Sequence, residues 1–245
     1  MNYVDQLEKS KNNKAILLYV NSPGGTVYES DELYLKLMEY KEKTKRPVYA
    51  YFGSQACSGA YYISMAADKI YTNRNTWTGS IGVIVSLTNY KKLYDKLGIK
   101  EIDITSGKNK SMGSGGLDLT DEQRDILQSL VDEAYDQFAG IVSEGRGLDI
   151  NTVKKIADGR IYSAKQAKEK GLVDEIGSED ELKALIRKEN KLGKDVVYDV
   201  AKSSGSDFLS GLMGSVQKIM PKSDSELAVD IVENKGKGVL MYYAD

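Results

Sequence analysis

Histidine is absent from the 245 residues, and this absence limits the chemistry that the chain can perform. A Ser-His-Asp triad cannot form without an imidazole base. The single cysteine, Cys57, excludes an intramolecular disulfide and a cysteine-based metal site. We therefore expect neither a metal nor a cofactor.

The chain also lacks a large excess of positive or negative charge and any long apolar run. With 34 basic and 36 acidic residues, the formal net charge is −2, so no broad positive field is available for a phosphate backbone. We therefore expect no nucleic-acid partner. No apolar run approaches the ~20 residues that span a bilayer, and the N-terminus lacks the apolar middle region of a secretory leader. The chain as given is expected to be soluble.

Short apolar runs alternate with helical patterns over the first two thirds of the chain, which is typical of an α/β fold with a parallel sheet and covering helices. The expected strands are 15–20, 48–52, 69–72, 81–85 and 101–104, with a brief strand within 171–177. The expected helices are 27–43, 59–67, 88–97, a long one from 120 to about 145, 150–157 and 164–170. Thr120 and Gln123 form a capping-box pattern at the start of the long helix.

The composition changes at about residue 193, where serine-rich and proline-containing stretches begin. We predict a domain over residues 1–192 with a C-terminal helical extension, followed by a partly mobile tail over 193–245. The tail ends in the apolar, strand-like segment 239–243. This segment could pair with a sheet edge or enter a binding groove as an added strand, and we favour the edge strand.

Ser58 lies between small residues just after the expected strand 48–52, where a nucleophile could stand at the start of a helix. On the sequence alone, capping of that helix is the better interpretation of Ser58. If Ser58 is a nucleophile, the absence of histidine makes lysine the natural base. For the neighbouring Cys57 we favour simple packing over a nucleophilic role.

The segment 21–25, Asn-Ser-Pro-Gly-Gly, follows the first expected strand directly. Paired glycines allow backbone N–H groups to converge on one point, as an oxyanion hole requires, although a plain Pro-Gly turn explains the same residues. If the strands before Gly25 and Ser58 are parallel neighbours, both residues reach the same edge of the sheet. The N–H of Gly59 would then be a second oxyanion donor.

A glycine- and serine-rich loop over residues 105–116 carries two lysines, Lys108 and Lys110, and composition does not choose between them. A lysine with its ordinary pKa of roughly 10.4 is a poor base at neutral pH. A lysine base must therefore be desolvated.

Several ordered blocks of this chain together resemble bacterial signal peptide peptidase A. The blocks are 21–25, 56–64, 66–70, 78–83, 106–110, 158–162, 166–167 and 171–175. The resemblance extends from about residue 3 to residue 181. Several blocks in one order are far more specific than any one of them.

The resemblance implies a serine peptidase with a Ser-Lys dyad in a crotonase-like or Clp-like α/β fold. By position, Ser58 matches the nucleophile, Lys110 the base and Ser80 the hydroxyl that orients the lysine. Gly25 and Gly59 match the oxyanion donors, and Gly24 belongs to the same substrate-binding turn.

Two residues differ from the family pattern. Ala60 stands where the family usually has a glycine, and Cys57 stands where it usually has an alanine. Both changes are expected to affect the substrate groove more than the dyad. Neither the membrane anchor nor the initial strand of family members is recognisable before Tyr3, so the chain is expected to be truncated.

The resemblance also implies a ring-like homo-oligomer, in which Ser58 and Lys110 come from neighbouring protomers. Extended apolar peptides, such as remnant signal peptides, are the expected substrates. The expected location is the cell membrane of a bacterium, with the catalytic domain outside the cytoplasm.

Two alternatives stay open on the sequence alone. A crotonase-type acyl-coenzyme A enzyme shares the fold but usually relies on acidic residues. A non-catalytic scaffold would use the groove only to bind peptides or its own tail.

Overall fold

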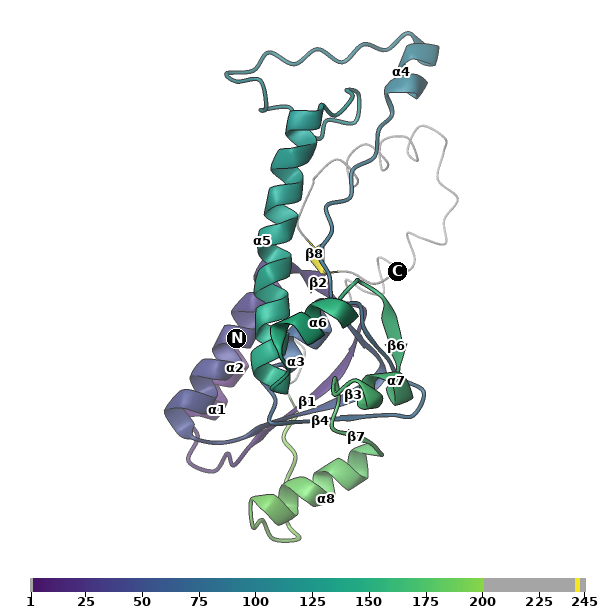
Figure 1. The fold of residues 1–245 in the computed structure, drawn as a ribbon. Coiled ribbons are helices and arrows are strands. Elements are labelled where there is room, and N and C mark those ends of the chain that lie inside the picture. Colours follow the sequence, from purple (N-terminus) through teal and green to yellow (C-terminus); the bar gives the residue numbers. More distant parts are fainter. Residues whose placement is uncertain (1, 201–240, 243–245) are drawn as a thin grey trace, which may run out of the picture. The chain divides into compact units, whose positions relative to one another are not determined.

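A computed structural model describes residues 2–200 and the backbone of residues 241–242, and the rest of the predicted tail lies outside the described residues. Figure 1 shows the order of the elements along the chain. The strands are β1 (Ile16–Ser22), β2 (Gly25–Thr26), β3 (Val48–Cys57), β4 (Lys69–Thr72), β5 (Trp77–Gly79), β6 (Ile161–Ser163), β7 (Glu175–Ile176) and β8 (Met241–Tyr242). The helices are α1 (Asn2–Lys9), α2 (Val27–Thr44), α3 (Gly59–Ser64), α4 (Lys91–Leu97), α5 (Asp121–Arg146), α6 (Ile150–Ile156), α7 (Ala164–Glu169) and α8 (Glu179–Glu189).

The chain divides into two compact units. The described part of the first unit comprises residues 2–85, 125–196 and 241–242, and that of the second comprises 86–124 and 197–200. The expected domain boundary between residues 192 and 193 stays a prediction, since most of the tail lies outside the described residues.

A six-stranded sheet forms the centre of the first unit, and its pairing confirms the predicted α/β fold. Strand β3 pairs in parallel with β1, β4 and β5, and β7 is parallel to β4. Only β6, which pairs with β5, is antiparallel within this sheet. Parallel neighbours need a crossover, which α2 supplies between β1 and β3 and α3 supplies between β3 and β4.

Side chains on β3 alternate between two apolar clusters, because successive residues of a strand face opposite sides of the sheet. Val48, Ala50 and Phe52 belong to the larger cluster, which α2, α3 and α5 complete. The intervening Tyr49 and Tyr51 pack with Leu182 and Ile186 of α8. Helices therefore cover both faces of this strand, as Figure 1 shows.

Helix ends follow the local signals that the sequence carries. The Thr120 hydroxyl accepts from the Gln123 amide, and the Gln123 side chain accepts from the Thr120 amide, so the predicted capping box is confirmed. Helix α4 ends at Gly98, which has φ 68°. It begins at Lys91 rather than at 88, because the side chain of Asn89 accepts from the Lys91 amide and holds a turn there.

Two predicted strands, 81–85 and 101–104, are wrong. Strand β5 ends at Gly79, and Gly79 and Ser80 both have positive φ. After this turn, Ile81 packs into the core and does not join the sheet. Residues 101–104 form no strand, and Ile104 is 99% exposed. No strand in the described part of the chain pairs with these residues, and alternation of apolar and polar residues does not by itself make a segment a strand.

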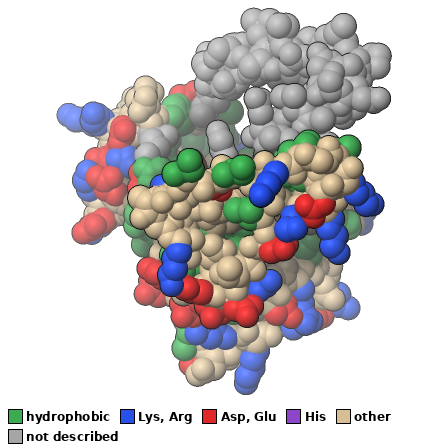
Figure 2. All heavy atoms as spheres, turned by 90° about the horizontal axis from the view of Figure 1, so that it is seen from above, with side chains coloured by type: hydrophobic (Ala, Val, Ile, Leu, Met, Phe, Trp, Pro, Cys, Tyr) green, Lys and Arg blue, Asp and Glu red, His purple; other side chains and the backbone are tan. Residues whose placement is uncertain are grey.

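The surface carries charges of both signs. On the face drawn in Figure 2, acidic and basic side chains lie in neighbouring positions, as a net charge of −2 leads one to expect. Among the described residues, no helix is both long enough and apolar enough to cross a lipid bilayer.

Candidate active site

The predicted neighbourhood of Gly25 and Ser58 is confirmed. Strands β1 and β3 are parallel, and Ser22 near the end of β1 is in register with Ala56 near the end of β3. Gly25 follows three residues after Ser22, and Ser58 directly follows β3. Both residues therefore lie at the carboxyl end of the sheet, where sites form in α/β proteins.

Ser58 occupies a strained turn between β3 and α3. Its backbone has φ 53° and ψ −121°, a conformation that a residue with a Cβ rarely adopts. Ser58 precedes the first residue of α3, but its side chain makes no capping hydrogen bond. The interpretation of Ser58 as a helix cap is therefore wrong, and the strain is of the kind that positions functional side chains.

The hydroxyl of Ser58 is buried without a partner. Its side-chain oxygen has no hydrogen bond to any described residue, and Ser58 is 0% exposed. Leaving a buried hydroxyl unpaired costs about 1–3 kcal/mol. Such a group is expected to meet a partner during function.

Cys57 does not share this character. Its thiol is buried and lies 3.6 Å from the carbonyl oxygen of Trp77, and burial raises its pKa to about 11. The thiolate that a nucleophilic role requires is therefore disfavoured. This supports packing as the role of Cys57.

Ser80 stands next to the backbone of Ser58. The Ser58 amide donates a 2.8 Å hydrogen bond to the carbonyl of Gly79, and the Ser80 amide donates at 2.8 Å to the carbonyl of Arg160. Ser80 has φ 48° and is 5% exposed. The structure therefore brings Ser58 and Ser80 together at the ends of β3 and β5.

Tyr162 supports this turn from β6. Gly79 has φ 85°, and a Cβ on it would lie 2.7 Å from the Tyr162 ring, so only glycine fits. The Tyr162 hydroxyl donates to the carbonyl of Ile156 at 2.7 Å, which holds the ring in place. Sequence reasoning assigned Tyr162 no role, because its contact with Gly79 depends on the pairing of β5 with β6.

The three glycines of the predicted oxyanion region differ. Gly24 has φ 129°, and its amide donates to the Ser22 hydroxyl at 3.2 Å, so its N–H already has a local partner. A Cβ on Gly25 would meet no described atom within 4 Å. Gly59 is the first residue of α3, where amides have no acceptor within the helix. The space beside Gly25 and the amide of Gly59 are therefore compatible with the predicted oxyanion hole.

The described part of the tail lies beside this glycine turn. Strand β8 pairs antiparallel with β2, with Tyr242 opposite Gly25 and Met241 opposite Thr26. The expectation of a strand in the segment 239–243 is confirmed for these two residues. Residues 239, 240 and 243–245 lie outside the described part.

The lysine loop belongs to the second unit, and the structure distinguishes its two lysines. The Lys108 ammonium lies 2.8 Å from a Glu122 carboxylate oxygen, and Asn109 also donates to Glu122. Lys110 is exposed, and its amine makes no ion pair or hydrogen bond with a described residue. Lys108 is thus committed to a salt bridge, and Lys110 is not.

Comparison with known proteins places this arrangement in a family. Residues 40–193 match the family described as "Peptidase family S49". An Enterococcus faecium protein named "Putative signal peptide peptidase SppA" is 44% identical over 218 residues, which are 87% of this chain and 62% of that protein. "Protease 4" of Haemophilus influenzae is 38% identical over 69% of this chain and 27% of its own length.

More distant relatives include "Capsid assembly protease C" of Escherichia phage lambda, which is 30% identical over 70% of this chain. The chain spans about three fifths of the length of the Enterococcus relative. The family match covers more than half of the chain and includes β3, the Ser58 turn and β5. The chain therefore belongs to peptidase family S49, with the crotonase/Clp-like α/β fold, and its resemblance to signal peptide peptidase A is confirmed.

Proposed function

We propose that this chain is a serine endopeptidase in which Ser58 is the nucleophile and Lys110 the general base. The observation that carries the proposal is the Ser58 hydroxyl, which is fully buried, unpaired among the described residues and held on a strained turn. Membership of peptidase family S49 supports the reaction class.

The first step is attack on a peptide carbonyl. A neutral Lys110 amine takes the proton of the Ser58 hydroxyl as its oxygen bonds to the carbonyl carbon. The amides of Gly25 and Gly59 stabilise the resulting oxyanion, aided by the positive end of α3. The protonated lysine then gives its proton to the leaving amine, and water releases the acyl group from Ser58 by the same route.

Ser80 is proposed to orient the lysine amine. This role is supported by the burial of Ser80 directly after Gly79, whose carbonyl accepts from the Ser58 amide, and by the hydrogen bond from the Ser80 amide to the Arg160 carbonyl. A hydroxyl in this position can accept a hydrogen bond from an amine.

We further propose that Lys110 is desolvated by assembly. Lys110 is exposed in the single chain, whereas a lysine base requires a water-poor environment. A ring-like homo-oligomer in which neighbouring protomers share active sites would supply that burial. Peptidase activity would then depend on protein concentration.

The proposed substrates are extended apolar peptides, such as remnant signal peptides, bound as an added strand. The antiparallel pairing of β8 with β2 supports this mode, because it places an extended backbone opposite Gly25. The same pairing supports the proposal that the tail occupies the groove as an inhibitor or substrate. By likeness to its relatives, we propose that the whole protein acts at a bacterial membrane, with the catalytic domain outside the cytoplasm.

A turnover assay with an apolar fluorogenic peptide tests the proposal, together with labelling by a fluorophosphonate. Wild-type protein should cleave the peptide and carry the label on Ser58, and Ser58→Ala should do neither. Labelling and turnover that persist in Ser58→Ala would overturn the assignment. Peptide binding without labelling or turnover would instead indicate a non-catalytic scaffold. The match to a peptidase family leaves the acyl-coenzyme A alternative without support.

A further inference from the structure

The Tyr62 hydroxyl links three helices in the first unit. It donates to the Asp31 carboxylate of α2 at 2.5 Å and accepts from the Gln137 side chain of α5 at 2.7 Å. Tyr62 itself belongs to α3 and is fully buried. A buried hydroxyl with both a donor and an acceptor partner is held in one place.

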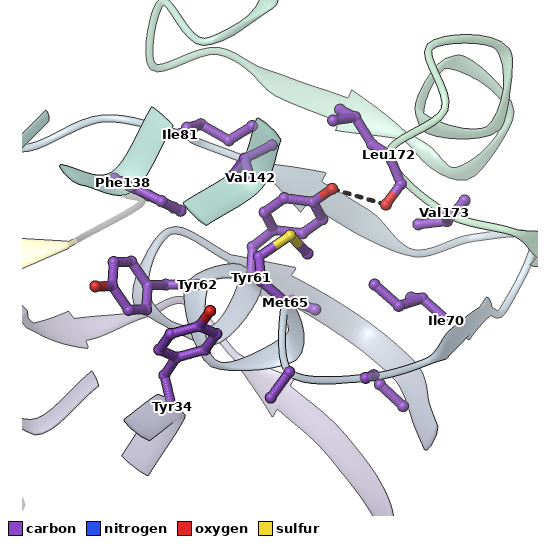
Figure 3. Close-up of a cluster of buried hydrophobic side chains, with 14 of the residues drawn as sticks. Tyr34, Tyr61, Tyr62, Met65, Ile70, Ile81, Phe138, Val142, Leu172 and Val173 are labelled. Carbon is purple, nitrogen blue, oxygen red and sulfur yellow. Dashed lines mark hydrogen bonds between the residues drawn. The ribbon is translucent and has the colours of Figure 1, made fainter. Parts of the chain in front are cut away.

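The ring of Tyr62 packs against two other aromatic rings. It packs edge-on against Tyr34, with ring centroids 5.5 Å apart, and lies tilted against Phe138, with centroids 5.1 Å apart. Figure 3 shows these rings together and shows that Tyr61, the preceding residue, points elsewhere, toward Leu172. Only Tyr62 of this pair therefore reaches α2.

Each end of the Tyr62–Asp31 hydrogen bond is close in the chain to a proposed oxyanion donor. The Tyr62 amide donates to the Ser58 carbonyl at 2.9 Å, one turn from the Gly59 amide. Asp31 lies in the second turn of α2, which directly follows Gly25 and Thr26. The neighbouring Ser30 hydroxyl donates to the Thr26 carbonyl at 2.7 Å and fixes the start of α2 to this turn.

We propose that Tyr62 and Asp31 are positioning residues of the peptidase, because their hydrogen bond sets the spacing between the Gly25 and Gly59 amides. This inference rests on the proposed oxyanion hole. Removing the bond would allow the starts of α2 and α3 to shift relative to each other. A misplacement of about 1 Å in such a site can lower a rate by about 10²-fold.

Neither residue touches the reacting atoms, so the effect should be smaller than the loss of a donor, which costs about 10²–10³-fold in kcat. For Tyr62→Phe we expect kcat to fall by about 10-fold or more at an unchanged KM. A peptide aldehyde, which forms a tetrahedral adduct with the nucleophile, should lose affinity by a similar factor. Asp31→Ala should act in the same direction with the Tyr62 ring intact.

Tyr61→Phe is the matched control. Tyr61 is on the same helix and equally buried, and its hydroxyl donates to the Leu172 carbonyl at 2.7 Å. Its loss should lower the melting temperature to an extent similar to that for Tyr62→Phe. It should leave kcat and aldehyde affinity within about 3-fold of wild type, because the bond to the Leu172 carbonyl does not link α3 to the turn that carries Gly25.

The experiment measures kcat, KM, aldehyde inhibition and thermal unfolding for wild type, Tyr62→Phe, Asp31→Ala and Tyr61→Phe, with Ser58→Ala alongside. Loss of kcat and aldehyde affinity in Tyr62→Phe and Asp31→Ala, but not in Tyr61→Phe, supports the inference. Equal losses in Tyr61→Phe, or wild-type kinetics in folded Asp31→Ala, would overturn it. Full activity in Ser58→Ala would instead overturn the proposed function, so the two failures are distinguishable.

Discussion

The amide of Ser58 donates a 2.8 Å hydrogen bond to the carbonyl of Gly79. This bond extends the pairing of β3 with β5 one residue past the end of β3, where the chain turns sharply into α3. It holds the backbone of Ser58 while its side chain has no partner among the described residues. The position of the hydroxyl is therefore set by the backbone and not by the hydroxyl's own contacts.

Ser58→Ala is expected to abolish peptidase activity without lowering the free energy of unfolding, because the removed hydroxyl is buried and unpaired. Ser64→Ala is the control, since its buried hydroxyl donates to the Ala60 carbonyl at 2.7 Å. That variant should keep its activity and lose about 1 kcal/mol of stability. Urea unfolding monitored by circular dichroism measures both changes. Equal destabilisation by the two substitutions would mean that Ser58 has a partner in solution.

Substitutions of the two loop lysines should have opposite consequences. Lys110→Ala is expected to abolish turnover, and so is Lys110→Arg, because a guanidinium does not give up its proton in proteins. Lys108→Ala breaks only an exposed ion pair with Glu122, which contributes little to stability, and should keep nearly full turnover. Initial rates with one apolar peptide at several protein concentrations compare the three variants. Inactive Lys108→Ala beside active Lys110→Ala would reverse the assignment.

Cys57 is expected to resist alkylation in the folded protein. Burial raises the pKa of its thiol to about 11, so almost no thiolate exists at pH 8. Iodoacetamide should therefore label Cys57 rapidly in urea and slowly in buffer, as followed by mass spectrometry. Cys57→Ala should keep turnover within a few-fold of wild type. Rapid labelling of native protein, accompanied by loss of activity, would contradict the packing role.

Deletion of residues 239–245 is expected to raise turnover of added peptide, because β8 pairs beside Gly25. A synthetic peptide with the sequence of residues 239–245 should restore inhibition of the shortened protein. Mass spectrometry of wild type and Ser58→Ala tests self-processing separately. Identical intact C-termini in both would exclude processing, and unchanged turnover after the deletion would exclude inhibition by the tail.

Asp174 should contribute to stability in a pH-dependent manner. Burial acts to raise its pKa, but the hydrogen bonds from the Arg146 guanidinium and the Ile70 amide outweigh burial and hold the pKa below 3.8. Because the folded-state pKa is the lower one, this stabilisation is complete above the unfolded value of roughly 3.9 and is lost as pH falls through the folded value.

Asp174→Asn should therefore cost about 2–3 kcal/mol at pH 7 and less at pH 3, since it leaves Arg146 buried without a counter-charge. Asp136→Asn, which breaks an exposed pair with Lys154, is the control and should leave the free energy of unfolding nearly unchanged at either pH. Chemical unfolding at pH 7 and pH 3 measures both. A cost for Asp174→Asn that does not depend on pH would contradict the paired role.

Local signals predicted local structure well. The Thr120–Gln123 capping box and the glycine at the end of α4 were read from neighbouring residues, and the geometry of both depends only on neighbouring residues. Residues 81–85 carried an equally clear strand pattern but follow two positive-φ residues, Gly79 and Ser80. That turn depends on contacts with Arg160 and Tyr162, far along the chain.

Sequence patterns alone were enough to identify the family of this chain. The absence of histidine excluded the commonest base for a serine nucleophile, and the ordered blocks around Ser58, Ser80 and Lys110 identified the family. Composition did not separate a capping Ser58 from a strained one. It also gave no signal for the Tyr62–Asp31 bond.

Both points depend on contacts that form when the chain folds. Strand pairing sets the turn at Ser58 and Gly79, and helix packing brings Tyr62 to Asp31. The Lys108–Glu122 ion pair joins residues 14 positions apart and leaves Lys110 as the lysine of that loop without a described partner. In each case the deciding contact joins residues distant in sequence, and its geometry exists only once the chain has folded.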